Sequence, residues 1–208
     1  AGLPTRILGR KYGNFLTFAS LEAGKESAPG QVTADELIHM YRYRSIGPQT
    51  AVYGVIANPV RHSMSPAVHN AAFADRGLDA VYLPFLVEGD VAEFLRAFRI
   101  LGVKGYSVTV PHKERALEAM DESDALGRRI GALNTIADRA GKLYGTNTDV
   151  GAAIAALEAA LGGRSPLREK SVVLIGAGGA ARAVAYGLLD RGAQVIIANR
   201  TVERAQAL

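Results

Sequence analysis

The sequence predicts an α/β protein, and three observations support this fold class. Apolar, β-branched segments alternate with helix-like segments from residue 50 to the end of the chain. Two of the apolar segments, residues 171–175 and 194–198, flank a glycine turn and a helix-like stretch. Glycines stand where several expected helices end, as at Gly77 and Gly102. Together these observations predict parallel α/β architecture throughout.

The composition limits the classes of function. The 208 residues are 49% hydrophobic and 21% charged, which is ordinary for a globular protein. The net charge of +4 fits an anionic small-molecule ligand and a plain solvated surface equally well, and no run of Lys and Arg indicates nucleic acid. The absence of cysteine excludes disulfides and thiol catalysis. No apolar run approaches the ~18 residues of a membrane span.

The first 45 residues read as the tail of a neighbouring domain. Residues 16–19 are expected to form a short strand, and a polar loop follows. Thr33 and Glu36 form a capping box, which predicts a helix from there to about Tyr43. A strand, a loop and a helix cannot bury a core alone.

Residues 51–150 read as a first α/β domain. Ser65 is expected to cap a helix whose first residue is Pro66 and which Gly77 ends. A second helix is expected over residues 91–100, and a short one opens at Pro111-His112-Lys113. The expected strands cover residues 50–57, 81–85, 105–110, 133–136 and 143–145, the last two joined by a turn at 138–141.

Residues 151–208 read as an incomplete dinucleotide-binding unit. An Ala-rich helix (151–161) and a linker (162–166) precede the two flanking strands, and a last helix starts near Val202. A sheet of two strands would expose a long unpaired edge. The chain is therefore expected to be a fragment, cut at both ends.

The glycine turn predicts both a cofactor and its type. Its glycines let the backbone approach a pyrophosphate, and the following helix supplies N–H groups. NAD-binding proteins place an acidic residue after the second strand, whereas this chain has a cation flanked by neutral polar residues, which favours NADP. The expected cofactor contacts are Gly176, Ala177, Gly178, Gly179, Ala180, Asn199, Arg200 and Thr201.

Other polar residues have the pattern of a substrate site. Ser63 and Ser65 stand two apart at an expected helix N-terminus, where an anion is favoured. Thr109 and Lys113 straddle a proline at the end of an expected strand, so both can point into a cleft. The four histidines are scattered and predict no metal site.

Four ordered motifs resemble the shikimate dehydrogenase family over residues 51–208. They are Asn58-Pro59-Val60-Arg61-His62-Ser63-Met64-Ser65-Pro66, Ser107-Val108-Thr109-Val110-Pro111-His112-Lys113, Gly131-Ala132-Leu133-Asn134-Thr135 and Asn147-Thr148-Asp149. Upstream, Arg6 and Ser27-Ala28-Pro29-Gly30-Gln31 resemble the C-terminal end of a type I 3-dehydroquinate dehydratase, a (β/α)₈ barrel. This order is similar to that of the bifunctional plant enzymes.

The resemblance implies a fold, a reaction and roles for residues. The fold would be a two-domain shikimate dehydrogenase fold: an α/β substrate domain (51–150) and a partial Rossmann NADP domain (151–208), after the barrel tail (1–45). The reaction would be NADP-dependent reduction of 3-dehydroshikimate to shikimate, in aromatic amino acid biosynthesis. The implied substrate contacts are Ser63, Ser65, Thr109, Asn134 and Asp149. Lys113 would be the catalytic acid/base beside Asp149, whereas Asn147 has no settled role.

In the barrel tail, Arg6, Ser27 and Gln31 match the dehydratase's substrate contacts. Its Schiff-base lysine and partner histidine belong to strands outside these residues, so no dehydratase activity is expected from the chain itself. The full-length bifunctional protein is expected to be a monomer that binds a small molecule and neither nucleic acid nor membrane. Its location would be the plastid if it is a plant protein, and otherwise the cytoplasm.

Three alternatives stay open. A quinate dehydrogenase belongs to the same superfamily, although Ser63, Ser65, Thr109 and Arg200 favour shikimate and NADP. A non-catalytic ligand-binding relative would be expected to lose the Lys113 and Asp149 pair, which is present. The chain could also be an inert fragment.

Overall fold

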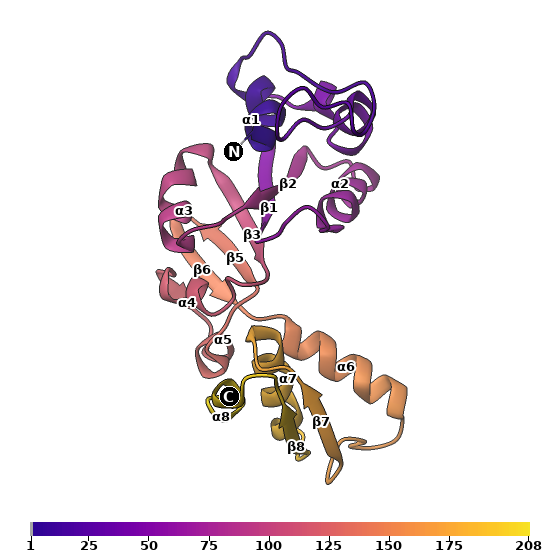
Figure 1. Ribbon diagram of the computed structural model, residues 1–208, viewed down its shortest axis with the longest axis vertical. Coiled ribbons are helices and arrows are strands. Elements are labelled where there is room, and N and C mark those ends of the chain that lie inside the picture. The colour runs from indigo at the N-terminus through magenta and orange to yellow at the C-terminus, as the bar shows by residue number, and fades with distance from the viewer. Residues whose placement is uncertain (1) are drawn as a thin grey trace. The chain divides into compact units, whose positions relative to one another are not determined.

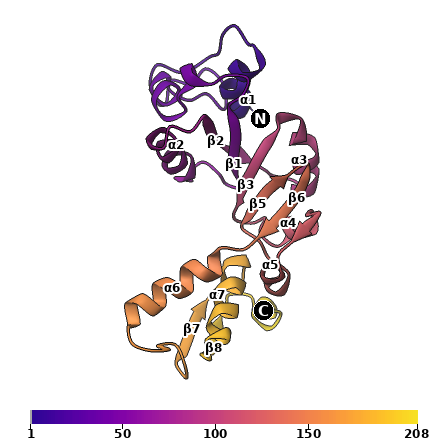
Figure 2. The same ribbon diagram turned by 180° about the vertical axis from the view of Figure 1, so that it is seen from behind.

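The computed structural model describes residues 2–208, which divide after Thr109 into two compact units. Figures 1 and 2 show the course of the chain from two sides. Each unit has its own strands and covering helices. Among the described residues, no helix is long and apolar enough to cross a membrane.

The first unit is built around three parallel strands in the order β2-β1-β3. Tyr53 of β1 pairs with Tyr82 of β2 on one side and with Gly105 of β3 on the other. The elements of this unit are α1 (Gly2–Leu8), η1 (Gly9–Tyr12), η2 (Glu36–Met40), η3 (Tyr43–Ser45), β1 (Ala51–Ala57), α2 (Ser65–Asp75), β2 (Ala80–Leu86), α3 (Val91–Ala97), η4 (Phe98–Leu101) and β3 (Val103–Val108).

Aromatic side chains bury both faces of these strands. On one face the rings of Tyr82 and His69 of α2 stack with centroids 4.2 Å apart. On the other face Phe85 lies 5.5 Å from Phe94 of α3 and 5.7 Å from Tyr106. Helices α2 and α3 accordingly lie on opposite sides of the strands in both views (Figures 1 and 2).

A buried asparagine satisfies the backbone of the edge strand β2. The side-chain amide of Asn70 donates to the Tyr82 carbonyl and its oxygen accepts from the Tyr82 N–H, both at 2.9 Å. Because a buried backbone group without a partner costs free energy, this pair closes the edge and anchors α2 to it.

The N-terminal segment confirms one prediction and corrects two. Thr33 and Glu36 form the expected capping box, with the Thr33 hydroxyl accepting from the Glu36 N–H at 3.1 Å and the Glu36 carboxylate accepting from the Thr33 N–H at 2.9 Å. The helix that follows ends at Met40, short of Tyr43. The strand predicted at residues 16–19 does not form, because no strand among residues 2–208 pairs with it. Leu16 and Phe18 are more than half exposed.

The second unit begins with three strands in the order β5-β6-β4. Strands β5 and β6 are antiparallel, so the prediction of parallel architecture throughout is wrong here. Their connection is only Ala140-Gly141, both with positive φ, and such a short turn cannot make the crossover that parallel strands need. The elements of this unit are α4 (Arg115–Glu118), β4 (Glu122–Ser123), α5 (Ala125–Ile130), β5 (Thr135–Arg139), β6 (Lys142–Thr146), α6 (Asp149–Leu161), β7 (Ser171–Ile175), α7 (Gly179–Asp190), β8 (Gln194–Ala198) and α8 (Val202–Gln206).

The dinucleotide unit has the predicted order of strand, turn, helix and strand. Strands β7 and β8 pair in parallel, with Ser171 opposite Gln194. Helices α6 and α7 lie side by side (Figures 1 and 2), and a β-carbon at Gly187 would lie 2.5 Å from Ile154. Glycine at 187 therefore permits the close approach of the two helices. The strands leave Val173 and Ile175 exposed.

Candidate active site

The glycine turn connects β7 to the N-terminus of α7. Gly176 has φ of +114°, a conformation that L side chains rarely adopt, and its N–H donates to the Ala198 carbonyl at 2.8 Å. Gly178 is extended, and α7 begins at Gly179. A β-carbon added at Gly176 or Gly178 would meet no atom within 4 Å beyond the neighbouring residues, so this surface of the turn is open. The free N–H groups of the first helical turn make such a surface a site for a phosphate group.

The residues after β8 present a cation. The Asn199 side-chain amide donates to the Thr201 carbonyl at 2.7 Å and holds the turn. Arg200 is exposed and makes no ion pair with any residue of the described part, 2–208. Its guanidinium is therefore available to a ligand anion.

The serines and Thr109 belong to the first unit. The ends of parallel strands lie at one edge of a sheet, which brings the loop after β1 close to the end of β3. The Thr109 N–H donates to the Ile56 carbonyl at 3.0 Å at this edge. The prediction that Ser65 caps α2 is wrong: Ser65 is the first helical residue, and the Ser63 hydroxyl accepts from the Ser65 N–H at 3.3 Å. The N-cap position itself is Met64, and no side chain caps the helix there.

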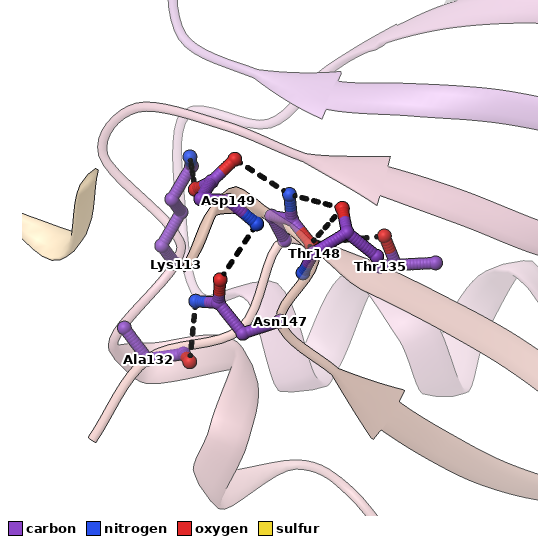
Figure 3. Close-up of polar contacts among 7 residues, drawn as sticks. Lys113, Ala132, Thr135, Asn147, Thr148 and Asp149 are labelled. Carbon is purple, nitrogen blue, oxygen red and sulfur yellow. Dashed lines mark hydrogen bonds and ion pairs between the residues drawn. The ribbon is translucent and has the colours of Figure 1, made fainter. Parts of the chain in front are cut away.

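Lys113 and Asp149 form a close ion pair in the second unit (Figure 3). The Lys113 Nζ lies 2.5 Å from Asp149 Oδ2, and the two side chains are only 13% and 27% exposed. Asp149 is in the first turn of α6, where the helix dipole favours a carboxylate. Partial burial shields the pair from solvent, so it is more than a surface salt bridge.

Asn134 fixes the other carboxylate oxygen. Its amide group donates to Asp149 Oδ1 at 2.7 Å and to the Thr148 hydroxyl at 2.9 Å. Its oxygen accepts from the Thr148 N–H at 3.0 Å. Each carboxylate oxygen of Asp149 is therefore held by a different side chain: Oδ2 by Lys113 and Oδ1 by Asn134.

Asn147 is a functional-site residue that sequence reasoning left without a role. It is 4% exposed, its amide donates to the Ala132 carbonyl at 3.0 Å, and its oxygen accepts from the Asp149 N–H at 2.9 Å. An asparagine two residues before a helical aspartate is the signal that could have indicated this turn. Asn147 ties the start of α6 to the segment that follows α5 (Figure 3).

The three residues of the N-terminal segment are placed as follows. Ser27 and Gln31 contact each other: the Ser27 N–H donates to the Gln31 side-chain oxygen at 2.8 Å, and the Gln31 amide donates to the Ser27 hydroxyl at 3.1 Å. The Nε of Arg6 is buried and has no hydrogen-bond partner within the described residues.

Comparison with known proteins assigns both parts of the chain. Residues 55–136 match the family model of the shikimate dehydrogenase substrate binding domain, and residues 158–208 match that of shikimate / quinate 5-dehydrogenase. The chain belongs to the shikimate dehydrogenase family. Residues 1–48 match the family model of type I 3-dehydroquinase. The resemblance seen in the motifs is confirmed, and so is the order of the two families along the chain.

Among sequence relatives, the bifunctional 3-dehydroquinate dehydratase/shikimate dehydrogenase of Arabidopsis thaliana, described as chloroplastic, is 48% identical over all of this chain and 36% of its own length. A shikimate dehydrogenase (NADP(+)) of Bacillus mycoides is 47% identical over 76% of this chain and 57% of its own length. The chain thus spans about a third of the plant relative and about half of the bacterial ones.

Solved structures confirm the two-domain shikimate dehydrogenase fold. The shikimate dehydrogenase of Aquifex aeolicus superposes with a TM-score of 0.72 and 42% identity, covering 78% of this chain and 60% of that one. The enzyme of Thermus thermophilus, solved with NADP(H) and shikimate, superposes with a TM-score of 0.66 and 37% identity, over 76% of this chain and 59% of that one.

Proposed function

We propose that the protein containing this chain reduces 3-dehydroshikimate to shikimate with NADPH. The observation that carries the proposal is the shielded Lys113 and Asp149 pair, with its 2.5 Å contact and its second carboxylate oxygen held by Asn134. A surface ion pair would not need this second hydrogen bond. The Arabidopsis and Bacillus relatives bear the names of this activity.

The pair suits general acid–base chemistry at a carbonyl. Lys113 would donate a proton to the ketone oxygen of the substrate during reduction and accept it from the hydroxyl in the reverse direction. Asp149 would orient the lysine and receive a hydrogen bond from the hydroxyl through a free lone pair. NADPH, when bound, supplies the hydride.

The turn fits NADP in three respects. The left-handed Gly176 and the open space at Gly178 leave room for a pyrophosphate, and α7 supplies backbone N–H groups from Gly179 and Ala180. Ala177 would line the same turn. Arg200 would pair with a 2′-phosphate, with Asn199 and Thr201 beside it. A carboxylate at this place would instead select NAD.

The remaining site residues complete the proposal. Ser63 and Ser65 would bind the substrate carboxylate at the N-terminus of α2, and Thr109 and Asn134 would contact its hydroxyls. The proposed division of the chain is a dehydratase tail over residues 1–45, a substrate domain over 51–150 and part of the NADP domain over 151–208. In the tail, Arg6, Ser27 and Gln31 would contact the dehydratase substrate. The intact protein would be a plastid monomer.

The test uses the intact protein and two lysine variants. Lys113→Ala should lower kcat for shikimate oxidation with NADP⁺ by about 10²–10⁴-fold, with the Kd values for NADPH and shikimate little changed. Lys142→Ala is the matched control, because Lys142 is 68% exposed and pairs with Glu122. Normal turnover of Lys113→Ala would refute the mechanism. Faster turnover of quinate than of shikimate would redirect the proposal to a quinate dehydrogenase.

A further inference from the structure

The start of α7 lies against the aliphatic stem of Lys113. A β-carbon at Gly179 would stand 2.8 Å from the Cβ of Lys113 and 3.4 Å from its Cδ. The first distance is shorter than carbon atoms tolerate, so either the helix or the lysine would have to move. The Lys113 Cβ cannot yield as a flexible side-chain end would, because the Lys113 carbonyl accepts from the Leu133 N–H at 2.9 Å.

Hydrogen-bonded and buried residues hold the segments on either side of the lysine stem. Ala132 is fully buried, and its Cβ would lie 3.4 Å from the same added atom. The Ala132 carbonyl is held by Asn147, which also binds the N–H of Asp149. One turn along α7, Arg182 pairs with Glu114 at 3.8 Å, which joins the helix to the residue after Lys113. The start of α7, the Lys113 segment and the start of α6 are thus packed together.

The three glycines of the turn differ in what they require. Gly176 needs its left-handed φ, and a β-carbon at Gly178 would meet open space. At Gly179 the backbone is helical and would suit any L residue. Glycine at 179 is therefore demanded by the space that Lys113 occupies.

We propose that Gly179 is a positioning residue for Lys113. The bare Cα of Gly179 forms the wall against which the stem rests, and this contact directs the ammonium group onto Asp149 Oδ2. The glycine turn thereby has two roles. Its open surface at Gly176 and Gly178 faces the nucleotide, and its packed surface at Gly179 positions the Lys113 amine. The second role rests on the proposed function for its catalytic meaning.

The experiment compares Gly179→Ala with Gly178→Ala in the intact protein. Without substrate or cofactor, the rate of reductive methylation of each lysine amine is measured by mass spectrometry, with Lys142 as internal reference. In Gly179→Ala the charge-assisted contact to Asp149 is lost, and labelling of Lys113 should be about tenfold faster. Gly178→Ala should leave the Lys113 rate within about twofold, because its added methyl touches nothing. Equal Lys113 rates in the wild type and Gly179→Ala would overturn the proposal.

Steady-state kinetics then distinguish the role of Gly179 from that of Gly178. Gly179→Ala should lower kcat by about 10²-fold through misplacement of the amine. Gly178→Ala should mainly raise the KM for NADP⁺, because it narrows the surface that faces the cofactor. If the wild-type protein oxidises neither shikimate nor quinate, the proposed function is refuted. If Lys113 is nevertheless labelled faster in Gly179→Ala, the positioning role is supported.

A variant that fails to fold does not remove the test. If Gly179→Ala melts below the assay temperature, the same labelling is done on Gly179→Ala/Ala132→Gly. Removing the Ala132 methyl deletes the neighbour 3.4 Å away and gives the helix room to shift. The Lys113 rate of this double variant should lie between those of the wild type and Asp149→Asn. A rate equal to that of the wild type and of Ala132→Gly alone would overturn the proposal.

Discussion

Replacing Asn147 with alanine tests whether this buried side chain anchors the start of α6, which carries Asp149 and its ion pair with Lys113. Asn147 is 4% exposed and makes two hydrogen bonds, to the Ala132 carbonyl at 3.0 Å and from the Asp149 N–H at 2.9 Å. Asn147→Ala removes both hydrogen bonds at once, so the Ala132 carbonyl and the Asp149 N–H each lose their side-chain partner. The start of α6, which carries Asp149, loses its link to Ala132.

The magnitude follows from burial. Each lost hydrogen bond costs about 0.5–1.5 kcal/mol, and a partner left buried and unsatisfied costs about 1–3 kcal/mol. Ala132 is fully buried, so its carbonyl bears the larger cost, whereas the Asp149 N–H stands at a helix terminus where water can reach it. We expect a loss of about 2–4 kcal/mol in the free energy of unfolding of the second unit.

The assay follows hydrogen exchange into peptides of α6 as a function of urea, which reports the opening of this unit. Asn199→Ala is the control, because Asn199 also donates to one backbone carbonyl but is part of an exposed turn. It should change the free energy by less than about 0.5 kcal/mol. If Asn147→Ala lowers the free energy of unfolding by less than about 1 kcal/mol, an effect as small as that of the control, the view that this asparagine anchors α6 is refuted.

Three further predictions concern the cofactor, the sheet and pH. Arg200→Asp should lower the ratio of kcat/KM for NADP⁺ over NAD⁺ by about 10²-fold, because a carboxylate repels a 2′-phosphate; an unchanged ratio contradicts the assigned role. Gly54→Ala should destabilise the first unit by about 1–3 kcal/mol in urea unfolding, since its methyl would lie 2.3 Å from Phe85, whereas Gly47→Ala has open space and should change little. Burial raises the pKa of Tyr41, so the native state keeps a proton that the unfolded state releases above about pH 10. Stability should therefore fall as pH rises past that value, and less steeply in Tyr41→Phe; parallel urea midpoints for the two proteins would disprove this.

The parts of the fold that could be predicted from the sequence are those set by residues close together along the chain. The strand, glycine turn and helix at residues 171–190 follow from β-branched residues and from glycine's freedom at Gly176. The capping box at Thr33 and Glu36 forms as its spacing predicts, because its bonds span only three residues. These features need no partner beyond the next strand along the chain, β8, which pairs with β7.

Predictions that depended on a distant partner were less successful. Residues 16–19 have the apolar character of a strand, but a strand exists only if another one pairs with it, and none of the described residues does. The predicted cap at Ser65 does not form, because α2 begins one residue earlier than expected: Met64 is the N-cap, and the Ser65 N–H donates to the Ser63 hydroxyl. The direction of β6 was set by a two-residue turn.

The sequence by itself determined the family and the glycine turn, and it is the source of the proposals that Arg200 selects NADP and that Lys113 and Asp149 form an acid/base pair. Only the tertiary structure decided that Asn134 binds the carboxylate of Asp149, that Asn147 binds its backbone N–H, and that Gly179 packs on Lys113. The physical reason is separation along the chain. Residues 113, 132, 147 and 179 meet because the starts of α6 and α7 pack against the segments that carry Lys113 and Ala132. No periodicity in the sequence encodes which atoms then come into contact.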